Sequence, residues 1–367
     1  MVALPYCEVR VINLAICWDS STLVNTFYSE NFTSYTQSAG NRNISSSSET
    51  TRVKSFNFEL FNTKRQSLNL KPIDSNWLSW FIGFTEGDGG LLVNRTASTS
   101  SSLRFVLTQK EGSILYEIKD LLGFGVVRYH PQGKGNNGFY RFTVANNKDI
   151  LNLALLFNGN LVIPHRINQV SSWIDLLTEK GLWIYGSSQA QPLISTLNDS
   201  WLSGFTDAEG CFNVNITSRK NTISGYRIRL RFLLDQKNAY NTLINIRNLF
   251  GFGRVSIRGE TNNVYRYSAD SFKGLESIHN YFISFPLKTK KAISFENWCK
   301  VFNMFLNKEH LSTEGFNKVR EIVKTININN SLNIKTGSAY PSASPSKKIN
   351  WIERLRYSPI LLVKVEK

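Results

Sequence analysis

The sequence contains one unit twice, and this internal repeat constrains the fold more than any other feature does. The pairs of segments that recur in the same order are Trp-Leu-Ser (77–79 and 201–203), Gln-Lys (109–110 and 236–237), Gly-Phe-Gly (123–125 and 251–253), Tyr-Arg (140–141 and 265–266) and a tryptophan (173 and 298). So many matches in one order are not coincidental. We therefore expect a duplicated and fused unit of about 125 residues.

Within each unit the apolar pattern changes period in a fixed order. An apolar segment of about three helical turns comes first, and stretches that alternate polar and apolar residues follow, such as 212–216 and 226–232. A helical segment precedes each Gly-Phe-Gly, two more strands come next, and helices at 147–156 and 293–307 close the units. The pattern predicts an α+β fold made of two pseudo-symmetric αββαββα repeats.

Composition sets the boundaries of the repeats. Residues 1–75 are rich in Ser, Thr and Asn, and we expect a poorly ordered extension there unless it folds on a partner. The first repeat is expected at 76–177, a linker with turn-forming residues at 178–200, and the second repeat at 201–330. Residues 331–367 form a Ser/Pro-rich and then basic tail.

The net charge of +16 and the pI near 9.7 favour a polyanionic partner, although a basic protein can also simply be soluble. Residues 1–76 hold seven basic and six acidic residues, so the excess positive charge lies downstream of them. The four cysteines and four histidines are scattered, which leaves no ligand set for zinc. The longest apolar run near the start is too short to span a bilayer, so we expect no membrane role.

Two acidic residues end the repeated apolar helices. Gly83 and Gly87 lie four residues apart in the first helix, so one helical face there carries no side chains. The same spacing recurs in the second helix with Gly204 and Ala208. If the helices pair through these faces, Asp88 and Glu209 meet at their C-terminal ends. The alternative, two solvated acids in loops, is weakened by their matching positions.

A pair of carboxylates at helix C-termini is costly by itself, because each opposes the helix dipole and the two repel each other. Divalent cations placed between the acids and a phosphodiester would offset this cost. Oxygen ligands without Cys or His suggest Mg²⁺ as the cofactor. We count Gly87 and Ala208, which precede the two acids, with this predicted metal site. Glu86 and Asp207 are also a matched pair, and we expect them to be structural.

These helices resemble the LAGLIDADG homing endonucleases, whose name is the consensus of the segments 81–89 and 202–210. The resemblance covers residues 77 to about 330 and is strengthened by segments 105–110 and 286–291. It implies that Asp88 and Glu209 bind the catalytic metals. It also implies a monomer with an internal pseudo-dimer, of the type encoded in introns of fungal mitochondrial genomes. A mitochondrial location follows from the same resemblance.

The family has a glutamine and a lysine beside the active site in each half. Gln109, Gln236 and Lys288 match these positions, whereas Ile163 stands where the first repeat should have its lysine. The resemblance therefore implies catalytic roles for Asp88, Glu209, Gln109, Gln236 and Lys288. The missing lysine puts equal cleavage rates on the two strands in doubt.

Alternating arginines indicate how double-stranded DNA would be held. Arg227, Arg229 and Arg231 share one face of a predicted strand, where arginine can bind guanine and neighbouring asparagines can bind adenine. An ordinary solvated face is the alternative for any single arginine. The predicted DNA-binding residues are Arg104, Arg128, Arg141, Asn213, Asn215, Arg227, Arg229, Arg231, Arg254, Arg258 and Arg266, with Lys290 and Lys291 on phosphates. The two sheets would be saddle-shaped and clamp the duplex.

The predicted activity is therefore Mg²⁺-dependent cleavage of both DNA strands at one long site. An RNA maturase that assists splicing of its own intron remains an alternative, and its partner would be intron RNA. A catalytically silent nucleic-acid-binding protein is a second alternative. Intact acids at both motif ends favour cleavage over the silent protein.

Overall fold

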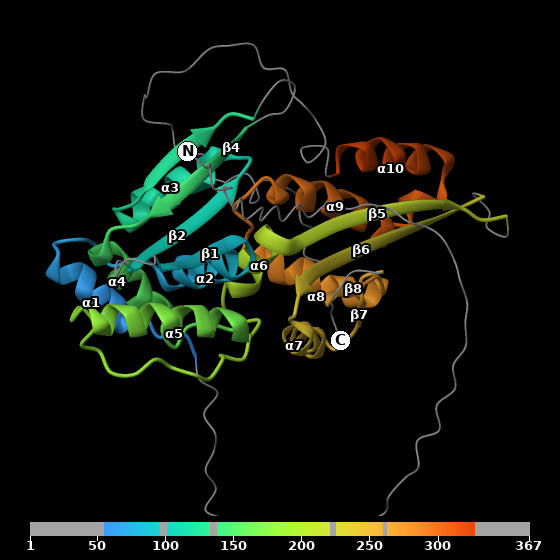
Figure 1. Ribbon diagram of the computed structural model, residues 1–367. Helices are drawn as coiled ribbons and strands as arrows, with labels where there is room; N and C mark the ends of the chain where they lie inside the picture. The colour runs from blue at the N-terminus through green and yellow to red at the C-terminus, as the bar shows by residue number, and fades with distance from the viewer. Residues whose placement is uncertain (1–54, 96–100, 133–137, 221–224, 260–262, 327–367) are drawn as a thin grey trace, which may run out of the picture. The chain divides into compact units, whose positions relative to one another are not determined.

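The computed structural model describes residues 55–95, 101–132, 138–220, 225–259 and 263–326 (Figure 1). The first repeat consists of α2 (Ser75–Asp88), β1 (Gly89–Arg95), β2 (Ser101–Gln109), α3 (Gly112–Leu122), β3 (Val126–His130), β4 (Phe139–Val144), α4 (Asn147–Phe157) and α5 (Pro164–Glu179). The second consists of α6 (Trp201–Glu209), β5 (Gly210–Ser218), β6 (Tyr226–Lys237), α7 (Tyr240–Phe250), β7 (Arg254–Ile257), β8 (Val264–Ala269), α8 (Phe272–Ser284) and α9 (Lys291–Leu306). The α+β repeat is confirmed, with one helix more at its end than expected.

Each repeat builds one four-stranded antiparallel sheet. The strand order is β1-β2-β4-β3 in the first sheet and β5-β6-β8-β7 in the second, so the two topologies are equivalent. The repeated Gly-Phe-Gly segments explain how α3 and α7 end. Gly123 and Gly251 cap these helices with φ of 82° and 75°, a left-handed conformation that glycine adopts at little cost.

The helices of each repeat cover one face of its sheet. Phe105 on β2 is fully buried and packs edge-on against Trp173 of α5, with ring centroids 6.5 Å apart. In the second repeat Phe212 on β5 packs on Trp298 of α9 at 5.8 Å. The recurring tryptophans therefore fill equivalent places in two cores. The opposite face of each sheet is left open by the helices of its own repeat.

The motif helices α2 and α6 form the most extensive helix–helix contact among the described residues. A Cβ atom added at Gly83 would collide with the carbonyl of Trp201 and lie 2.8 Å from the amide nitrogen of Phe205. A Cβ added at Gly204 would collide in the same way with the carbonyl of Trp80. The helices approach backbone to backbone here, as the small-residue faces predicted.

Part of the segment that was expected to be a poorly ordered extension forms a helix. Residues 59–67 form α1 (Glu59–Ser67), and Phe61 on this helix is 1% exposed. Arg65 donates hydrogen bonds to the carbonyls of Leu122 (2.7 Å) and Leu121 (3.0 Å) at the end of α3. The sequence pattern missed this helix because the polar neighbourhood hid a small buried face. Residues 1–54 and 327–367, and with them the expected tail, lie outside the described residues.

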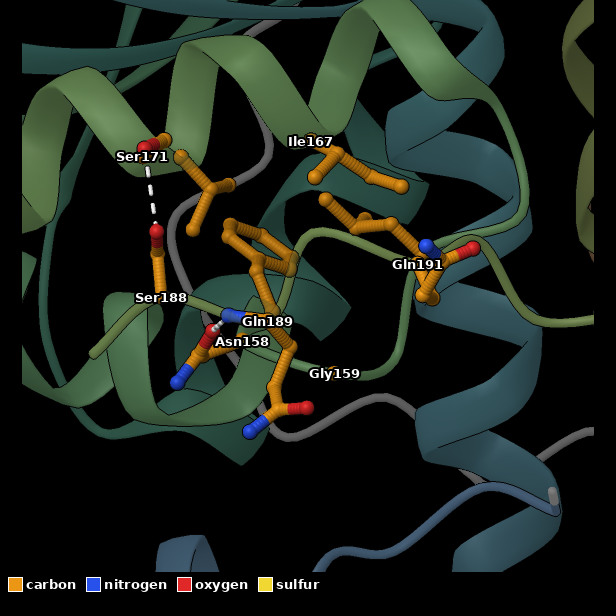
Figure 2. Close-up of a pocket in the computed structure, with 10 residues that line it drawn as sticks. Asn158, Gly159, Ile167, Ser171, Ser188, Gln189 and Gln191 are labelled. Carbon is orange, nitrogen blue, oxygen red and sulfur yellow. Dashed lines mark hydrogen bonds between the residues drawn. The ribbon is translucent and has the colours of Figure 1, made fainter. Parts of the chain in front are cut away.

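The linker between the repeats packs against the first of them. Figure 2 shows Ser188 hydrogen-bonded to Ser171 of α5 (3.0 Å), and the Gln189 amide donating to Asn158 after α4 (2.7 Å). The gap among these residues is too small to hold a water molecule. Beyond α9, a short 3₁₀ turn η1 (Glu309–Leu311) leads to α10 (Thr313–Thr325), where Phe316 stacks on Tyr226 of β6 at 4.8 Å.

None of the helices in the described parts of the chain combines the length and apolar composition that crossing a bilayer requires.

Candidate active site and nucleic-acid interface

Asp88 and Glu209 lie at the adjoining C-terminal ends of α2 and α6. A methyl group added at Gly87 would lie 3.1 Å from Cγ of Glu209, which shows how closely the two helix ends meet. Both acidic side chains are half-buried. The crossing of the motif helices thus brings together two acids that are more than a hundred residues apart in the sequence.

The environment of the two acids disfavours their negative charge. Burial raises the pKa of Asp88, an effect that the charge of Lys291 and a hydrogen bond from Gln109 partly offset. Burial also raises the pKa of Glu209 to about 8, and the negative charge of Asp88 adds to this rise. Burial of the pair therefore outweighs the positive charges of Lys291 and Arg166, which lie close to both acids.

The two glutamines differ in their relation to the acids. Gln109 donates its side-chain amide to Oδ2 of Asp88 over 2.6 Å. Gln236 occupies the equivalent place on β6 and is 7% exposed. Within the described residues it makes no corresponding hydrogen bond to Glu209. The expected symmetry of the glutamines is thus present in position but not in hydrogen bonding.

Arg166 and Lys291 are the basic residues at the centre of the site. Arg166 donates to the carbonyls of Glu86 (3.0 Å) and Gly87 (3.3 Å), at the end of α2. Lys291 donates in the same way to the carbonyls of Thr206 (3.1 Å) and Ala208 (2.7 Å), at the end of α6. Cations at helix C-termini interact favourably with the helix dipole. They therefore offset part of the electrostatic cost of placing acids at the same helix ends.

These contacts bear on three expectations. Lys291, which was expected on a phosphate, lies in the acid cluster, where burial lowers its pKa while the nearby acids oppose that effect. The carbonyls of Gly87 and Ala208, expected at the metal, accept hydrogen bonds from Arg166 and Lys291. Ile163 carries no charge in the first repeat, but the guanidinium of Arg166 lies beside the end of α2 there. The sequence does mark these two residues, because Arg166 follows Ile163 by three places and Lys291 follows Lys288 by three places.

The side chain of Lys288 makes a different contact. It is exposed, and its ammonium sits 5.7 Å above the ring centre of Trp80. The backbone amide of Lys288 donates to Asp207 (2.7 Å), two residues before Glu209 in α6. Lys290 is also exposed, and its backbone amide donates to Glu111.

The expected structural role of Glu86 and Asp207 is confirmed. Glu86 is fully buried and accepts the indole N–H of Trp201 (2.6 Å) together with the backbone amides of Val162 and Ile163. Asp207 is likewise buried and bonded to the opposite motif helix. Burial raises the pKa of Glu86 to about 7, and these donors offset part of the rise.

The predicted DNA-binding side chains share the open faces of the sheets. Asn213 pairs with Arg231 across the strands, Asn215 with Arg229, and Asp235 with Arg266, so these residues point to one side. Residues between them in β6, such as Leu230 and Phe232, are buried on the other side. In the first sheet Arg141 pairs with Arg128 on one side and with Thr108 on the other. Thr108 lies two residues after Val106 and four after Arg104 in β2, so all of these side chains share the open face. Each open face therefore carries several arginines.

A duplicated α+β chain that joins two basic sheet faces to a shared pair of helix-end acids has the architecture of a nucleic-acid-cleaving enzyme. The family model described as LAGLIDADG endonuclease matches residues 81–177 and 202–302. This chain belongs to that family.

Relatives and solved structures agree with the family. Over 260 residues the chain is 33% identical to probable intron-encoded endonuclease 4 of Neurospora crassa, covering 70% of this chain and 45% of that protein. It is 28% identical to an uncharacterized cox1 intron-2 protein of 37.2 kDa from Schizosaccharomyces pombe, covering 77% of this chain and 83% of that one. The chain thus spans less than half of the first relative.

Among solved structures, the LAGLIDADG meganuclease I-AabMI bound to uncleaved DNA superimposes with a TM-score of 0.57 at 25% identity. The match covers 68% of this chain and 99% of that one.

Proposed function

We propose that the chain is a site-specific endonuclease that hydrolyses both strands of duplex DNA. The observation that carries this proposal is the meeting of Asp88 and Glu209 at the ends of two crossed helices, beside two open sheet faces rich in arginine. The solved relative I-AabMI is bound to DNA. The open faces of this chain supply the positive charge and the guanidinium donors that a duplex requires.

The two acids suit divalent cations, and we propose Mg²⁺. Their donors are hard oxygens, which Mg²⁺ prefers. Burial raises the pKa of both carboxyls, and a bound cation would favour their charged forms. No cluster of three or more His, Cys, Asp or Glu side chains is found among the described residues, so phosphate and water oxygens would complete the coordination. Bound Mg²⁺ would make a water more acidic and neutralise charge at the phosphodiester.

The surrounding residues position and charge the site. Gln109 holds the orientation of the Asp88 carboxylate through its 2.6 Å hydrogen bond. Lys291 and Arg166 bring positive charge to both sides of the acid pair, where a transition state with more negative charge would form. We propose that Lys291, rather than Lys288, fills the lysine role that the resemblance implies. Gln236 and Lys288 remain proposals for the periphery of the site.

The family and the relatives also bear on the setting of the protein. The S. pombe relative is named for an intron of cox1, and we propose that this chain is likewise an intron product of a mitochondrial gene. Both acids come from one chain, so a monomer can supply the whole site.

The test uses the full chain and DNA that spans the exon junction of its own intron, with the intron removed. With Mg²⁺, plasmid carrying this junction should be linearised at one site. Asp88→Asn and Glu209→Gln should bind the same DNA without cutting it, because the sheets remain intact. If neither Mg²⁺ nor Mn²⁺ supports cleavage and the chain binds its intron RNA more tightly than any DNA, the maturase alternative replaces this proposal.

A further inference from the structure

The second sheet carries an acid on the face that is left for DNA. Among the eight strands that the structure describes, Asp235 on β6 is the only aspartate or glutamate. Its side chain is 17% exposed and shares the open face with Arg266 and Arg258. A negative charge on this face weakens attraction for a polyanion, so it requires a compensating function.

Asp235 holds Arg266 by both of its carboxylate oxygens. Nε of Arg266 donates to Oδ1 over 2.6 Å, and Nη2 donates to Oδ2 over 2.8 Å. Arg258 approaches Oδ2 through Nη1 at 3.2 Å. A fork of two parallel hydrogen bonds fixes the plane of a guanidinium as well as its position. Arg266 is therefore oriented before any ligand arrives.

The first sheet lacks this arrangement. Thr108 occupies the place of Asp235 in the strand register, and Arg141 occupies that of Arg266. Nε of Arg141 reaches the Thr108 hydroxyl at only 3.4 Å. A hydroxyl provides one weak acceptor and no charge, so it does not fix the guanidinium plane. The two halves of the pseudo-symmetric protein thus differ at one equivalent pair.

The fork leaves part of Arg266 available for a ligand. A guanidinium has five N–H donors, and two of them are used by Asp235. The remaining edge can donate two parallel hydrogen bonds, which match O6 and N7 of guanine in the major groove. Pre-orientation lowers the conformational entropy that arginine loses on binding.

The strand register places this pair near the catalytic end of the sheet. Gly210, which follows Glu209, pairs with Leu234, which precedes Asp235. The base pair that Arg266 can reach therefore lies near the cleavage position rather than at the outer end of the site.

We propose that Asp235 is a specificity-determining positioning residue that orients Arg266 to read a guanine in the half-site bound by the second repeat. This inference rests on the proposed DNA cleavage. It also implies that the first repeat, with Thr108 and Arg141, tolerates more base changes at the equivalent position.

The test compares cleavage profiles on a DNA library in which every base pair of the wild-type site is varied singly. The half-site of the second repeat is assigned as the one whose profile changes in Arg227→Ala, at the outer end of β6. Wild type should require guanine at one position near the cleavage site, with roughly 5- to 150-fold discrimination. Asp235→Asn should lose most of this preference there and nowhere else, and its affinity for DNA should not fall.

Three further variants separate positioning from other roles. Arg266→Lys keeps the charge but cannot present a planar fork, so it should lose the guanine preference even if Asp235→Asn proves unstable. In the Arg266→Lys background, Asp235→Asn should change nothing more at that position. Thr108→Ala, the matched control in the first repeat, should leave the profile of the second half-site unchanged.

The outcomes distinguish this inference from the proposed function. If wild type cuts one site but the profile of Asp235→Asn equals that of wild type, the positioning role is wrong and the endonuclease proposal stands. A uniform loss of affinity over all sequences in Arg266→Lys would show a phosphate contact and would also overturn the inference. If wild type cuts no member of the library, both proposals fail.

Discussion

The indole N–H of Trp80 on α2 donates to the carboxylate of Asp207 on α6, over 2.8 Å. The reciprocal bond runs from Trp201 on α6 to Glu86 on α2, over 2.6 Å. Each carboxylate also accepts backbone amides from the segment that begins the last large helix of its own repeat, such as Lys288 for Asp207. Two buried acids therefore join the motif helices to each other and to the segments that carry Arg166 and Lys291.

This crossing of helices depends on glycine. Gly83→Ala should destabilise the protein by about 1–3 kcal/mol or more, because the added methyl group collides with the Trp201 carbonyl and must separate two backbones. Gly90→Ala is the matched control, since its nearest new neighbour would be 3.7 Å away. Urea unfolding of both variants measures the difference. If Gly83→Ala and Gly90→Ala were equally stable, the close approach of α2 and α6 would not contribute to stability.

The N-terminal helix α1 should be part of the folded core. Phe61→Ala should cost about 3–5 kcal/mol of unfolding free energy, as for other buried phenylalanines. Leu60 is the neighbouring residue on the same helix and is 47% exposed, so Leu60→Ala should cost much less. Chemical denaturation followed by tryptophan fluorescence checks this. If Phe61→Ala left the unfolding free energy unchanged, α1 would not belong to the folded core, and the poorly ordered extension would reach residue 75.

The stability of the metal-free protein should depend on Glu209. In the folded protein burial raises the pKa of Glu209 to about 8, whereas the unfolded chain has the ordinary value near 4.5. Between these values the folded state binds more protons, so stability falls as pH rises from about 4.5 to about 8. The loss should be a few kcal/mol at most, because the side chain is partly exposed and screened.

Glu209→Gln removes that proton equilibrium and should be more stable than wild type at pH 8 in EDTA, but not at pH 4. Exposed Glu276→Gln on α8 serves as the control and should follow wild type. Thermal unfolding at a series of pH values measures both. If wild type and Glu209→Gln lose stability in parallel, the carboxyl is not perturbed as described.

The lysine assignment can be tested directly. Lys291→Met should slow cleavage by ~100- to 1,000-fold at saturating protein, because it removes a buried charge beside both acids. Arg166 stays in the first repeat, so one strand should be cut before the other and nicked circles should accumulate. Lys288→Met, with its ammonium over Trp80, should change the rate less than tenfold. If Lys288→Met slowed cleavage more than Lys291→Met did, Lys288 and not Lys291 would fill the catalytic lysine role.

Much of the fold followed from the repeated landmarks, because helix and strand periods change in the same order in both units. The faces of the arginine-bearing strands also followed from simple alternation. The matched basic residues Arg166 and Lys291 are visible in the sequence, but their contacts with the ends of the motif helices are not. These contacts depend on where the last helix of each repeat begins relative to the motif helix. The sequence also could not show that Asp235 binds the guanidinium of Arg266, because the two residues lie on different strands and are 31 residues apart in the sequence.

The reciprocal Trp–carboxylate bonds limit how such proteins can be recombined. A chimera that joins the first repeat of this chain to the second repeat of a relative brings together a tryptophan and an acid that did not evolve as partners. A glutamate–aspartate mismatch at position 86 or 207 would leave a buried indole N–H or a buried carboxylate without its partner. New DNA specificities built by exchanging halves should therefore carry residues 75–88 and 201–209 as one matched block and exchange only the sheets.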